Sequence, residues 1–154
     1  MAAQKEDGII PRILIAGTSS GSGKTSVVCG LLGAYRDRGL RLAAFKCGPD
    51  YIDPMFHREV LGISSGNLDS FFQDAALLHQ NLQQYGRGAD LSVIEGVMGY
   101  YDGIGFGTEA GTAQVAALTD TPVILVVDCR GRAVSALAEV YGFLHFRQEG
   151  AQIR

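Results

Sequence analysis

A glycine- and serine-rich turn that ends in Lys24 and Thr25 is the segment of the chain best suited to chemistry. It reads Gly-Thr-Ser-Ser-Gly-Ser-Gly-Lys-Thr over residues 17–25, between an apolar run at 12–16 and a segment with helical spacing at 26–38. Because consecutive backbone N–H groups at the start of a helix cradle phosphate oxygens, this arrangement predicts a P-loop. Lys24 would place its charge on the β- and γ-phosphates of ATP, and Thr25 would offer its hydroxyl to Mg²⁺.

The residues expected to bind ATP here are Thr18, Ser19, Ser20, Gly21, Ser22, Gly23, Lys24, Thr25 and Ser26. Gly21 and Gly23 would let the backbone approach the phosphates without a Cβ in the way. One feature departs from the usual pattern, because its first glycine falls at Thr18 and Gly17 lies one residue too early. An ordinary turn that happens to contain Gly-Lys-Thr is the alternative, but the order of strand, turn and helix favours the P-loop.

A P-loop needs a further carboxylate for Mg²⁺ or its water shell. Glu95 is the best candidate, since it ends the apolar run 91–94 and is followed by a glycine. The alternative is a surface glutamate at a strand terminus. Asp128 ends another apolar run, but it could equally cap the helix that follows.

Two more aspartates lie in a loop at residues 47–54 that contains two prolines. Asp50 and Asp53 could converge on a metal or on polar groups of a ligand, or they could serve Asx turns and caps. Lys46, directly before this loop, is either a second cation facing phosphate or a solvated strand end. Asp102 stands before a glycine, a pair that by itself predicts a turn.

Short apolar runs alternate with helical patterns along the chain, which predicts an α/β fold with a mostly parallel sheet and helices on both faces. The carboxyl ends of the strands then lie at one edge of the sheet, where ligands of such folds bind. The predicted strands are 12–16, 42–45, 91–94 and 123–127, with a further strand beginning at 152–154. The predicted helices are 26–38, 55–61, 74–85 (with Asp74 as N-cap), 112–118 and 133–146.

The length of 154 residues fits one domain, expected at 12–154 after a disordered lead-in at 1–11. A net charge of −3 without a Lys/Arg run argues against nucleic acid and anionic membranes as partners, and the apolar runs are too short to span a bilayer. Cys29, Cys47 and Cys129 lack the spacing of a metal site. We expect them to be buried free thiols, which favours a reducing, cytoplasmic location.

Several segments together resemble the N-terminal domain of the cobyrinic acid a,c-diamide synthases, the amidating enzymes of corrin biosynthesis. The resemblance runs from Arg12 to Arg154, and Gly-Pro-Asp-Tyr-Ile-Asp-Pro (48–54) and Glu-Gly-Val-Met-Gly (95–99) are more specific than the P-loop. The other segments are AGTSSGSGKTS (16–26), FKCGPDYIDPMFH (45–57), NLDSFF (67–72), VIEGVMGYYDG (93–103) and VILVVDCRG (123–131). The early Gly17 is the form typical of this family.

The resemblance implies a P-loop fold like that of dethiobiotin synthetase, a three-layer α/β/α arrangement. It also implies a C-terminal glutamine amidotransferase domain, which this chain lacks, so we expect the chain to be a fragment of a longer enzyme. In the implied reaction, ATP phosphorylates the a and c carboxylates of cobyrinic or hydrogenobyrinic acid in turn, and ammonia displaces phosphate from each acyl phosphate.

The resemblance also implies functional roles for the residues that occupy matching positions in these segments. The residues expected to serve catalysis are Lys24, Asp50, Asp53 and Asp102. Lys46 is expected to join the ATP site. The residues expected to bind Mg²⁺ are Thr25, Asp50 and Glu95. The resemblance thus raises Asp102 from a turn residue to a site residue.

Other functions remain as alternatives. Amidation of a different tetrapyrrole, such as nickel-sirohydrochlorin, would use the same mechanism. Dethiobiotin synthetase is disfavoured by the segment at 48–54. A partition-type ATPase, acting as a nucleotide-switched binding protein, usually has a further lysine early in the P-loop, where this chain has Thr18, Ser19 and Ser20. A nucleotide-binding module without chemistry is the last alternative, and a monomer and a homodimer both stay open.

Overall fold

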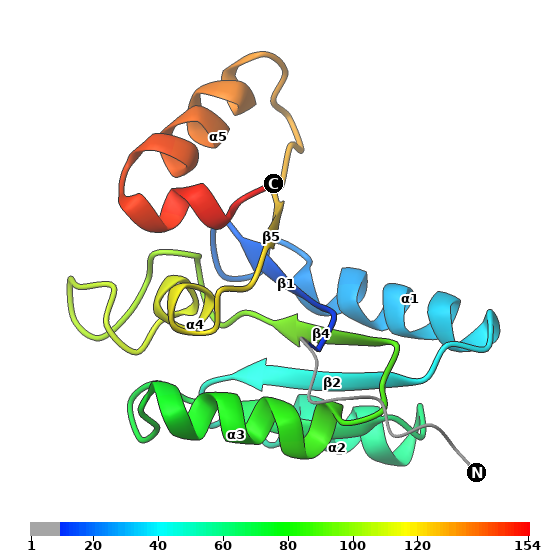
Figure 1. Cartoon of the computed structure of the whole chain (residues 1–154). Helices are drawn as coiled ribbons and strands as arrows, with labels where there is room; N and C mark the ends of the chain where they lie inside the picture. The colour runs from blue at the N-terminus through cyan, green and yellow to red at the C-terminus, as the bar shows by residue number, and fades with distance from the viewer. Residues whose placement is uncertain (1–9) are drawn as a thin grey trace, which may run out of the picture.

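Five parallel strands form a single sheet in the computed structural model, which describes residues 10–154 except for the side chains of Glu149 and Ala151 (Figure 1). The strands are β1 (Arg12–Gly17), β2 (Leu42–Cys47), β3 (Ser64–Leu68), β4 (Leu91–Glu95) and β5 (Val123–Val126). Their order across the sheet is β3-β2-β4-β1-β5, so β1 and β4 lie at its centre. The first nine residues of the expected lead-in lie outside the described part of the chain.

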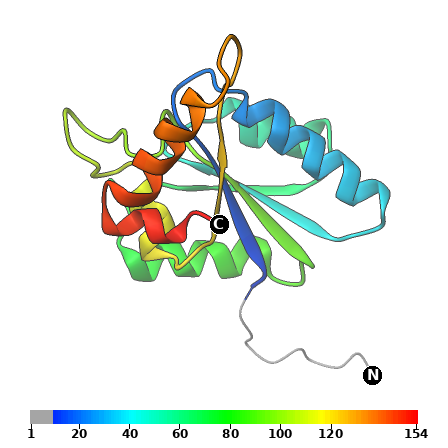
Figure 2. The ribbon, with the colours of Figure 1, turned by 90° about the horizontal axis from the view of Figure 1, so that it is seen from above.

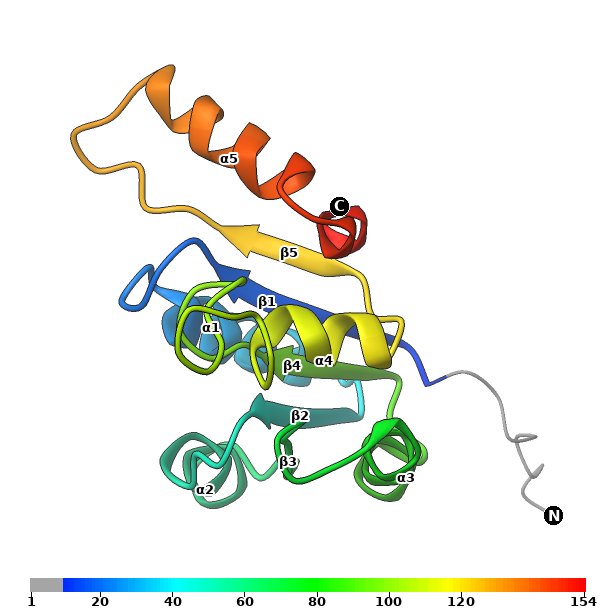
Figure 3. The same ribbon diagram turned by 90° about the vertical axis from the view of Figure 1, so that its left-hand side faces the viewer.

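Helices cover both faces of this sheet. They are α1 (Lys24–Asp37), α2 (Ile52–Glu59), α3 (Ala75–Gly86), α4 (Thr112–Leu118) and α5 (Ser135–His145), followed by a 3₁₀ helix at Gln148–Gln152. α1 lies on the opposite side of the sheet from α3 and α4 (Figure 2). α5 lies beside β5 at one end of the sheet, and α2 and α3 lie beside β2 and β3 at the other (Figure 3). The predicted α/β/α architecture is therefore confirmed.

The central strand β1 is apolar because it is buried on both faces. Leu14 and Ala16 belong to the core beneath α3 and α4, whereas Ile15 belongs to the core beneath α1. All three side chains are buried. Since successive side chains of a strand point to opposite faces, the same alternation sends Lys46 and Glu95 to the side of the sheet that α1 covers.

The sequence did not predict β3, and it misplaced the start of α2. β3 reads Ser-Ser-Gly-Asn-Leu, a sequence with low β-propensity. Its backbone pairs with β2 from Ser64 to Leu68, and this pairing does not depend on apolar side chains. Helix α2 begins at Ile52, so the predicted loop at 47–54 is shorter than expected.

The strand expected to begin at 152–154 is confirmed in part. A 3₁₀ helix extends to Gln152, but Ile153 forms an isolated parallel bridge with Val123, and the Arg154 N–H donates to the Val123 carbonyl (2.9 Å). Other elements match their prediction closely: α4 spans the predicted residues, and the Asp74 side chain accepts a hydrogen bond from the Leu77 N–H as the N-cap of α3.

The three cysteines are free thiols, as predicted, but they are not all buried. Cys47 is buried in the core, Cys29 is half-buried, and Cys129 is exposed just beyond β5. The expectation of burial is therefore wrong for Cys129, because the loop after β5 runs outward to Arg130 instead of into the core. No described helix is both long enough and apolar enough to cross a membrane.

Thiol alkylation should separate these cysteines. Burial raises the pKa of Cys47 to about 12, so its thiol stays neutral and shielded in the folded protein. We expect iodoacetamide at mildly alkaline pH to modify Cys129 rapidly, and to modify Cys47 only after urea unfolds the chain. Peptide mass spectrometry of samples taken over time measures both rates. Equal rates for Cys47 and Cys129 in the folded protein would contradict the burial of Cys47.

Candidate nucleotide-binding site

The loop between β1 and α1 has the geometry of a phosphate cradle, and all the residues from Thr18 to Ser26 lie in it or in the first turn of α1. Gly17, the last residue of β1, has less space for a side chain than the other glycines of this segment. A Cβ at this position would lie 2.1 Å from the Ser22 Oγ and 3.1 Å from the Lys24 side chain. A side chain at Gly17 would therefore displace the Ser22 hydroxyl and crowd Lys24, so glycine suits this position in the loop.

The start of α1 is open toward this loop. Gly23 occupies the N-cap position with a φ of 98°, a conformation that favours glycine, and no side chain caps the helix. In the chain itself, a Cβ at Gly23 meets nothing within 4 Å, so its backbone conformation accounts for the glycine. The first N–H groups of α1 thus lack a side-chain partner, as a helix that binds phosphate requires.

The Lys24 side chain lies folded between the P-loop and the loop that follows β4. Its ammonium donates hydrogen bonds to the carbonyl of Ser19 (3.0 Å) and to the carbonyl of Met98 (2.6 Å). Burial lowers the pKa of Lys24, and the charge of Lys46 lowers it further, while Glu95 and Asp102 oppose the shift. An anion placed in the loop would relieve the burial cost and the repulsion between the two lysines.

Beside the P-loop lies a group of four side chains that we call the Lys46 cluster: Thr25, Lys46, Asp53 and Glu95. Lys46 and Glu95 are register partners in the parallel β2–β4 pair, so they lie side by side on one face. The Lys46 ammonium donates to Glu95 Oε1 (2.8 Å) and to Asp53 Oδ2 (2.6 Å). The Thr25 hydroxyl donates to the same Glu95 Oε1 (2.6 Å).

Glu95 is fully buried, so the interpretation as a surface glutamate is wrong. Lys46 is also buried, which excludes a solvated strand end. Burial works to lower the pKa of Lys46, but its hydrogen bonds to Asp53 and Glu95 outweigh that effect, and the pKa rises above its ordinary value. Lys46 is therefore a charged ammonium that neutralises Glu95.

The Lys46 cluster has acceptor atoms and negative charge that could bind a further cation. Glu95 Oε2 is buried and accepts no hydrogen bond within the described structure. Three carboxylates, those of Asp50, Asp53 and Glu95, lie within 3.9 Å of the single ammonium of Lys46. Hydroxyl and carboxylate oxygens are the ligands that Mg²⁺ prefers, usually together with waters and substrate phosphates. Within residues 10–154, no group of three or more His, Cys, Asp or Glu side chains could hold a metal by itself, so a cation here would depend on such additional ligands.

Asp50 makes the Asx turn that the sequence offered as one alternative, and it also lies at the edge of the Lys46 cluster. Its Oδ1 accepts a hydrogen bond from the Ile52 N–H (2.9 Å), which is an Asx turn, and its Oδ2 lies 3.9 Å from the Lys46 ammonium. Asn67 of β3 holds this loop in place by donating to the carbonyls of Gly48 and Asp50. Sequence reasoning missed Asn67 because it missed β3, although the segment NLDSFF contains it.

Asp102 likewise lies in a turn and near the P-loop. Its Oδ2 accepts a hydrogen bond from the Gly99 N–H (2.9 Å), and its charge raises the pKa of Lys24. The loop is fastened at two further points. The Tyr100 N–H donates to the carbonyl of Gly17 (2.8 Å), and the buried Thr112 hydroxyl bonds both backbone groups of Val97. Thr112 is a second positioning residue that the sequence did not reveal.

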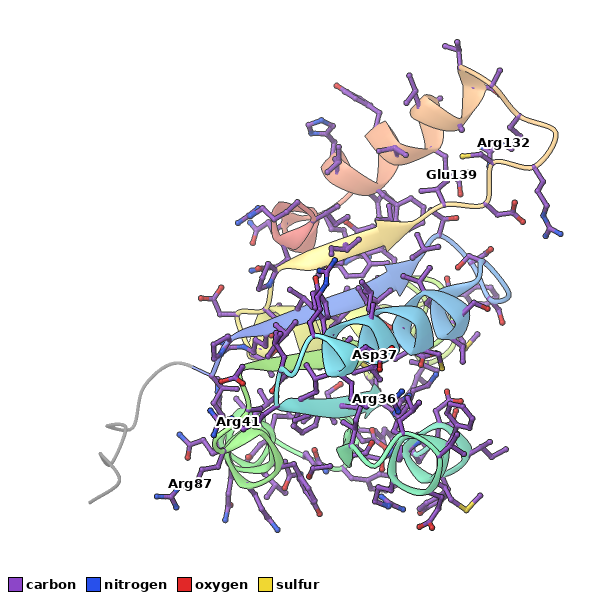
Figure 4. The ribbon with its side chains drawn as sticks, turned by 90° about the vertical axis from the view of Figure 1, so that its right-hand side faces the viewer. Arg36, Asp37, Arg41, Arg87, Arg132 and Glu139 are labelled. Atoms are coloured by element: carbon purple, nitrogen blue, oxygen red, sulfur yellow. The ribbon has the colours of Figure 1, made fainter. Side chains whose placement is uncertain are left out.

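Asp128 takes no part in the cluster. Its carboxylate accepts hydrogen bonds from the Arg130 side chain and N–H, which hold its pKa at about 2. The N-cap of α5 is Val134, so the alternative of a helix cap is wrong as well. Helix α5 reaches the P-loop in another way, since Glu139 hydrogen-bonds Thr18 and pairs with Arg132 (Figure 4).

His57 is a further buried polar residue close to the cluster, one turn after Asp53 on α2. Neither of its ring nitrogens has a hydrogen-bond partner in the described part of the chain. Burial lowers its pKa, an effect that Glu95 and Asp53 oppose, so His57 favours the neutral form. The sequence assigned His57 no function, and its burial would not have been visible from spacing alone.

The parallel sheet, the glycine-bounded loop and the lysine and threonine at the start of α1 together define a P-loop nucleotide-binding domain. Residues 13–97 match the family model described as CobQ/CobB/MinD/ParA nucleotide binding domain, and the chain belongs to this family. The chain superimposes on the signal recognition particle receptor FtsY from Elizabethkingia anophelis with a TM-score of 0.60 over 91% of this chain and 48% of that one. At 15% identity, this likeness concerns the fold.

Curated relatives are more similar in sequence. The chain is 49% identical, over 90% of its length, to a cobyrinate a,c-diamide synthase from Listeria monocytogenes. It is 44% identical, over 97% of its length, to a hydrogenobyrinate a,c-diamide synthase from Streptomyces coelicolor. The resemblance drawn from the sequence is thus confirmed. The chain spans 31% of the length of each of these two relatives.

The Lys46 cluster makes a prediction about stability. Replacing Lys46 by Met should lower the free energy of unfolding at neutral pH by about 3–5 kcal/mol, because it leaves the buried Glu95 without its cation. The double variant Lys46→Met/Glu95→Gln should recover much of this loss. Since the folded-state pKa of Lys46 is raised, the stabilisation is fully present below the unfolded value and disappears as the pH rises through the folded value. Urea unfolding measures these free energies.

Arg41→Gln provides the control, because Arg41 forms an exposed ion pair with Asp90 outside the Lys46 cluster. Figure 4 shows Arg41 at the opposite end of the molecule from Arg132 and Glu139. The effect of Arg41→Gln should be much smaller. If Lys46→Met were as mild as Arg41→Gln, Glu95 would not depend on Lys46.

Proposed function

We propose that this chain is the ATP- and acceptor-binding part of an amidoligase that converts the a and c carboxylates of cobyrinic or hydrogenobyrinic acid into amides, in cobalamin biosynthesis. The observation that carries the proposal is the Lys46 cluster. It joins the two segments most specific to the cobyrinic acid a,c-diamide synthases, 48–54 and 95–99, to the P-loop through hydrogen bonds of 2.6–2.8 Å. The names of the relatives give the acceptor.

The proposed chemistry explains why an amidating enzyme needs ATP. Ammonia does not displace oxide from a carboxylate, because oxide is a very poor leaving group. An acceptor carboxylate oxygen therefore attacks the γ-phosphorus of ATP, the bond to ADP breaks, and an acyl phosphate forms. Ammonia then attacks the carbonyl carbon and phosphate leaves. Positioning and charge neutralisation are the main contributions of the protein to the first step.

The residues of this chain have separate tasks in that scheme. The backbone of Thr18–Ser26 and the Lys24 ammonium hold the triphosphate, and binding requires Lys24 to exchange its carbonyl partners for phosphate oxygens. Asp53 fixes the position of Lys46, and Asp50 lies at the edge of the same cluster. Asp102, held by the Gly99 N–H and close enough to act electrostatically on Lys24, would orient the acceptor.

Mg²⁺ would be held by Thr25 and Glu95, with Asp50 nearby, and the unpartnered Glu95 Oε2 supports this assignment. A bound Mg²⁺ neutralises charge on the β- and γ-phosphates. The ammonia would come from glutamine hydrolysed by an amidotransferase domain outside this chain. Cys29, Cys47 and Cys129 are not proposed as its nucleophile, since none occupies a matching motif.

Mass spectrometry of the acceptor tests the proposal. The full-length protein, incubated with Mg-ATP, ammonium and cobyrinic acid, should yield two successive products, each lighter by the difference between a hydroxyl and an amino group. Both should require ATP and disappear in Lys24→Ala, while the surface variant Arg41→Gln should retain them. Conversion of a sirohydrochlorin-type acid in place of cobyrinic and hydrogenobyrinic acid would refute the acceptor, and ATP binding without conversion of any tetrapyrrole acid would refute the reaction class.

A further inference from the structure

A cavity of about 310 Å³ lies at the carboxyl ends of β2, β3 and β4, next to the nucleotide site. Its walls are mainly apolar, with Asp69 and Asp102 as the acidic residues among them. The apolar side chains that matter here are Pro49, Phe71, Phe72, Val97, Met98 and Ile104. Ligand sites of proteins have this character, with an apolar lining and a few polar groups that fix orientation.

Two phenylalanines form an exposed aromatic wall of this cavity. Phe71 and Phe72 are 61% and 73% exposed, and their rings pack edge to face at 4.7 Å. A buried aspartate fixes the turn that presents them: the Asp69 carboxylate accepts the Phe71 N–H (2.9 Å), and the Asp69 carbonyl accepts the Phe72 N–H (3.2 Å). This turn holds two large apolar rings in solvent. Exposed rings contribute little hydrophobic free energy to the fold, whereas a ligand that covered them would bury apolar surface.

The cavity and the phosphate loop share a wall. Met98 lines the cavity, and its carbonyl accepts the hydrogen bond from the Lys24 ammonium at 2.6 Å. Asp102 also lines the cavity and acts electrostatically on Lys24. A molecule whose apolar body enters the cavity can therefore reach the cation of the P-loop with a group at its edge.

We propose that this cavity binds the apolar edge of the acceptor acid, and that Phe71 and Phe72 are specificity-determining residues that pack against it. This inference rests on the proposed function and names the acceptor subsite of the same site. The occupant is an acid with a large, flat, apolar body. The volume admits one edge of such a body, and the shared wall at Met98 leaves a carboxylate at that edge directed toward the P-loop.

The inference predicts that Phe71 and Phe72 affect acceptor binding and leave nucleotide binding intact. Replacing Phe72 by Ala should weaken the binding of cobyrinic acid about tenfold, because it removes a buried aromatic contact. Phe71→Ala/Phe72→Ala should weaken it further, whereas Phe72→Tyr should bind like the wild type. Titration calorimetry on the full-length protein, with a non-hydrolysable ATP analogue present, measures these constants. In turnover, KM for the acceptor should rise while kcat changes little.

Phe106→Ala is the matched control, because Phe106 is fully exposed on the same loop as Ile104 and lies outside the cavity lining. Since Phe71 and Phe72 are exposed, their variants should unfold at the same urea concentration as the wild type. If the wild type bound the acceptor and the double variant bound it equally well, the cavity assignment would be wrong and the proposed function would stand. If the double variant lost affinity for the ATP analogue by the same factor as for the acceptor, the cavity assignment would also be wrong. If the wild type bound no tetrapyrrole acid at all, both the proposed function and this subsite would fail.

Discussion

The ion pair between Lys46 and the buried Glu95 is the interaction on which the rest of this site depends. A carboxylate with no exposed surface is costly unless a cation and hydrogen bonds compensate for its lost hydration. Here the compensation comes from three elements: Lys46 from β2, Thr25 from the first turn of α1, and Asp53 from α2 by way of Lys46. Moving β2 would leave the buried Glu95 without its cation, and moving α1 or α2 would remove a hydrogen bond from the cluster, so the cluster ties the P-loop to the sheet.

The sheet topology makes this convergence possible. Because β4 lies between β1 and β2, Glu95 is placed beside both the P-loop and Lys46, although these residues are far apart in the sequence. Side-chain hydrogen bonds then fix the loops above the strands. Asn67 holds the loop after β2, Thr112 holds the loop after β4, and Asp69 holds the turn after β3. The nucleotide site and the apolar cavity consequently lie on one edge and share Met98 as a wall.

Features that depend on neighbouring residues were predictable from the sequence. The P-loop, the central strands, α4 and the Asp74 cap each arise from a local pattern of glycines, apolar residues or a capping side chain. Features that depend on pairing across the sheet were not predictable. β3 is polar and exists because β2 pairs with it, so Asn67 and Asp69 were missed along with it. The burial of Glu95 and the exposure of Cys129 also follow from tertiary placement.

We propose that the buried Glu95 carboxylate lets the P-loop use Mg²⁺ when it binds ATP. Titration calorimetry of a non-hydrolysable ATP analogue, with and without Mg²⁺, tests this claim most directly in the wild type, in Glu95→Gln and in the surface control Asp128→Asn. We predict that Mg²⁺ strengthens binding in the wild type and in Asp128→Asn, and that Glu95→Gln loses this gain while still folding. An undiminished gain in Glu95→Gln would contradict the account and return Glu95 to a purely structural role.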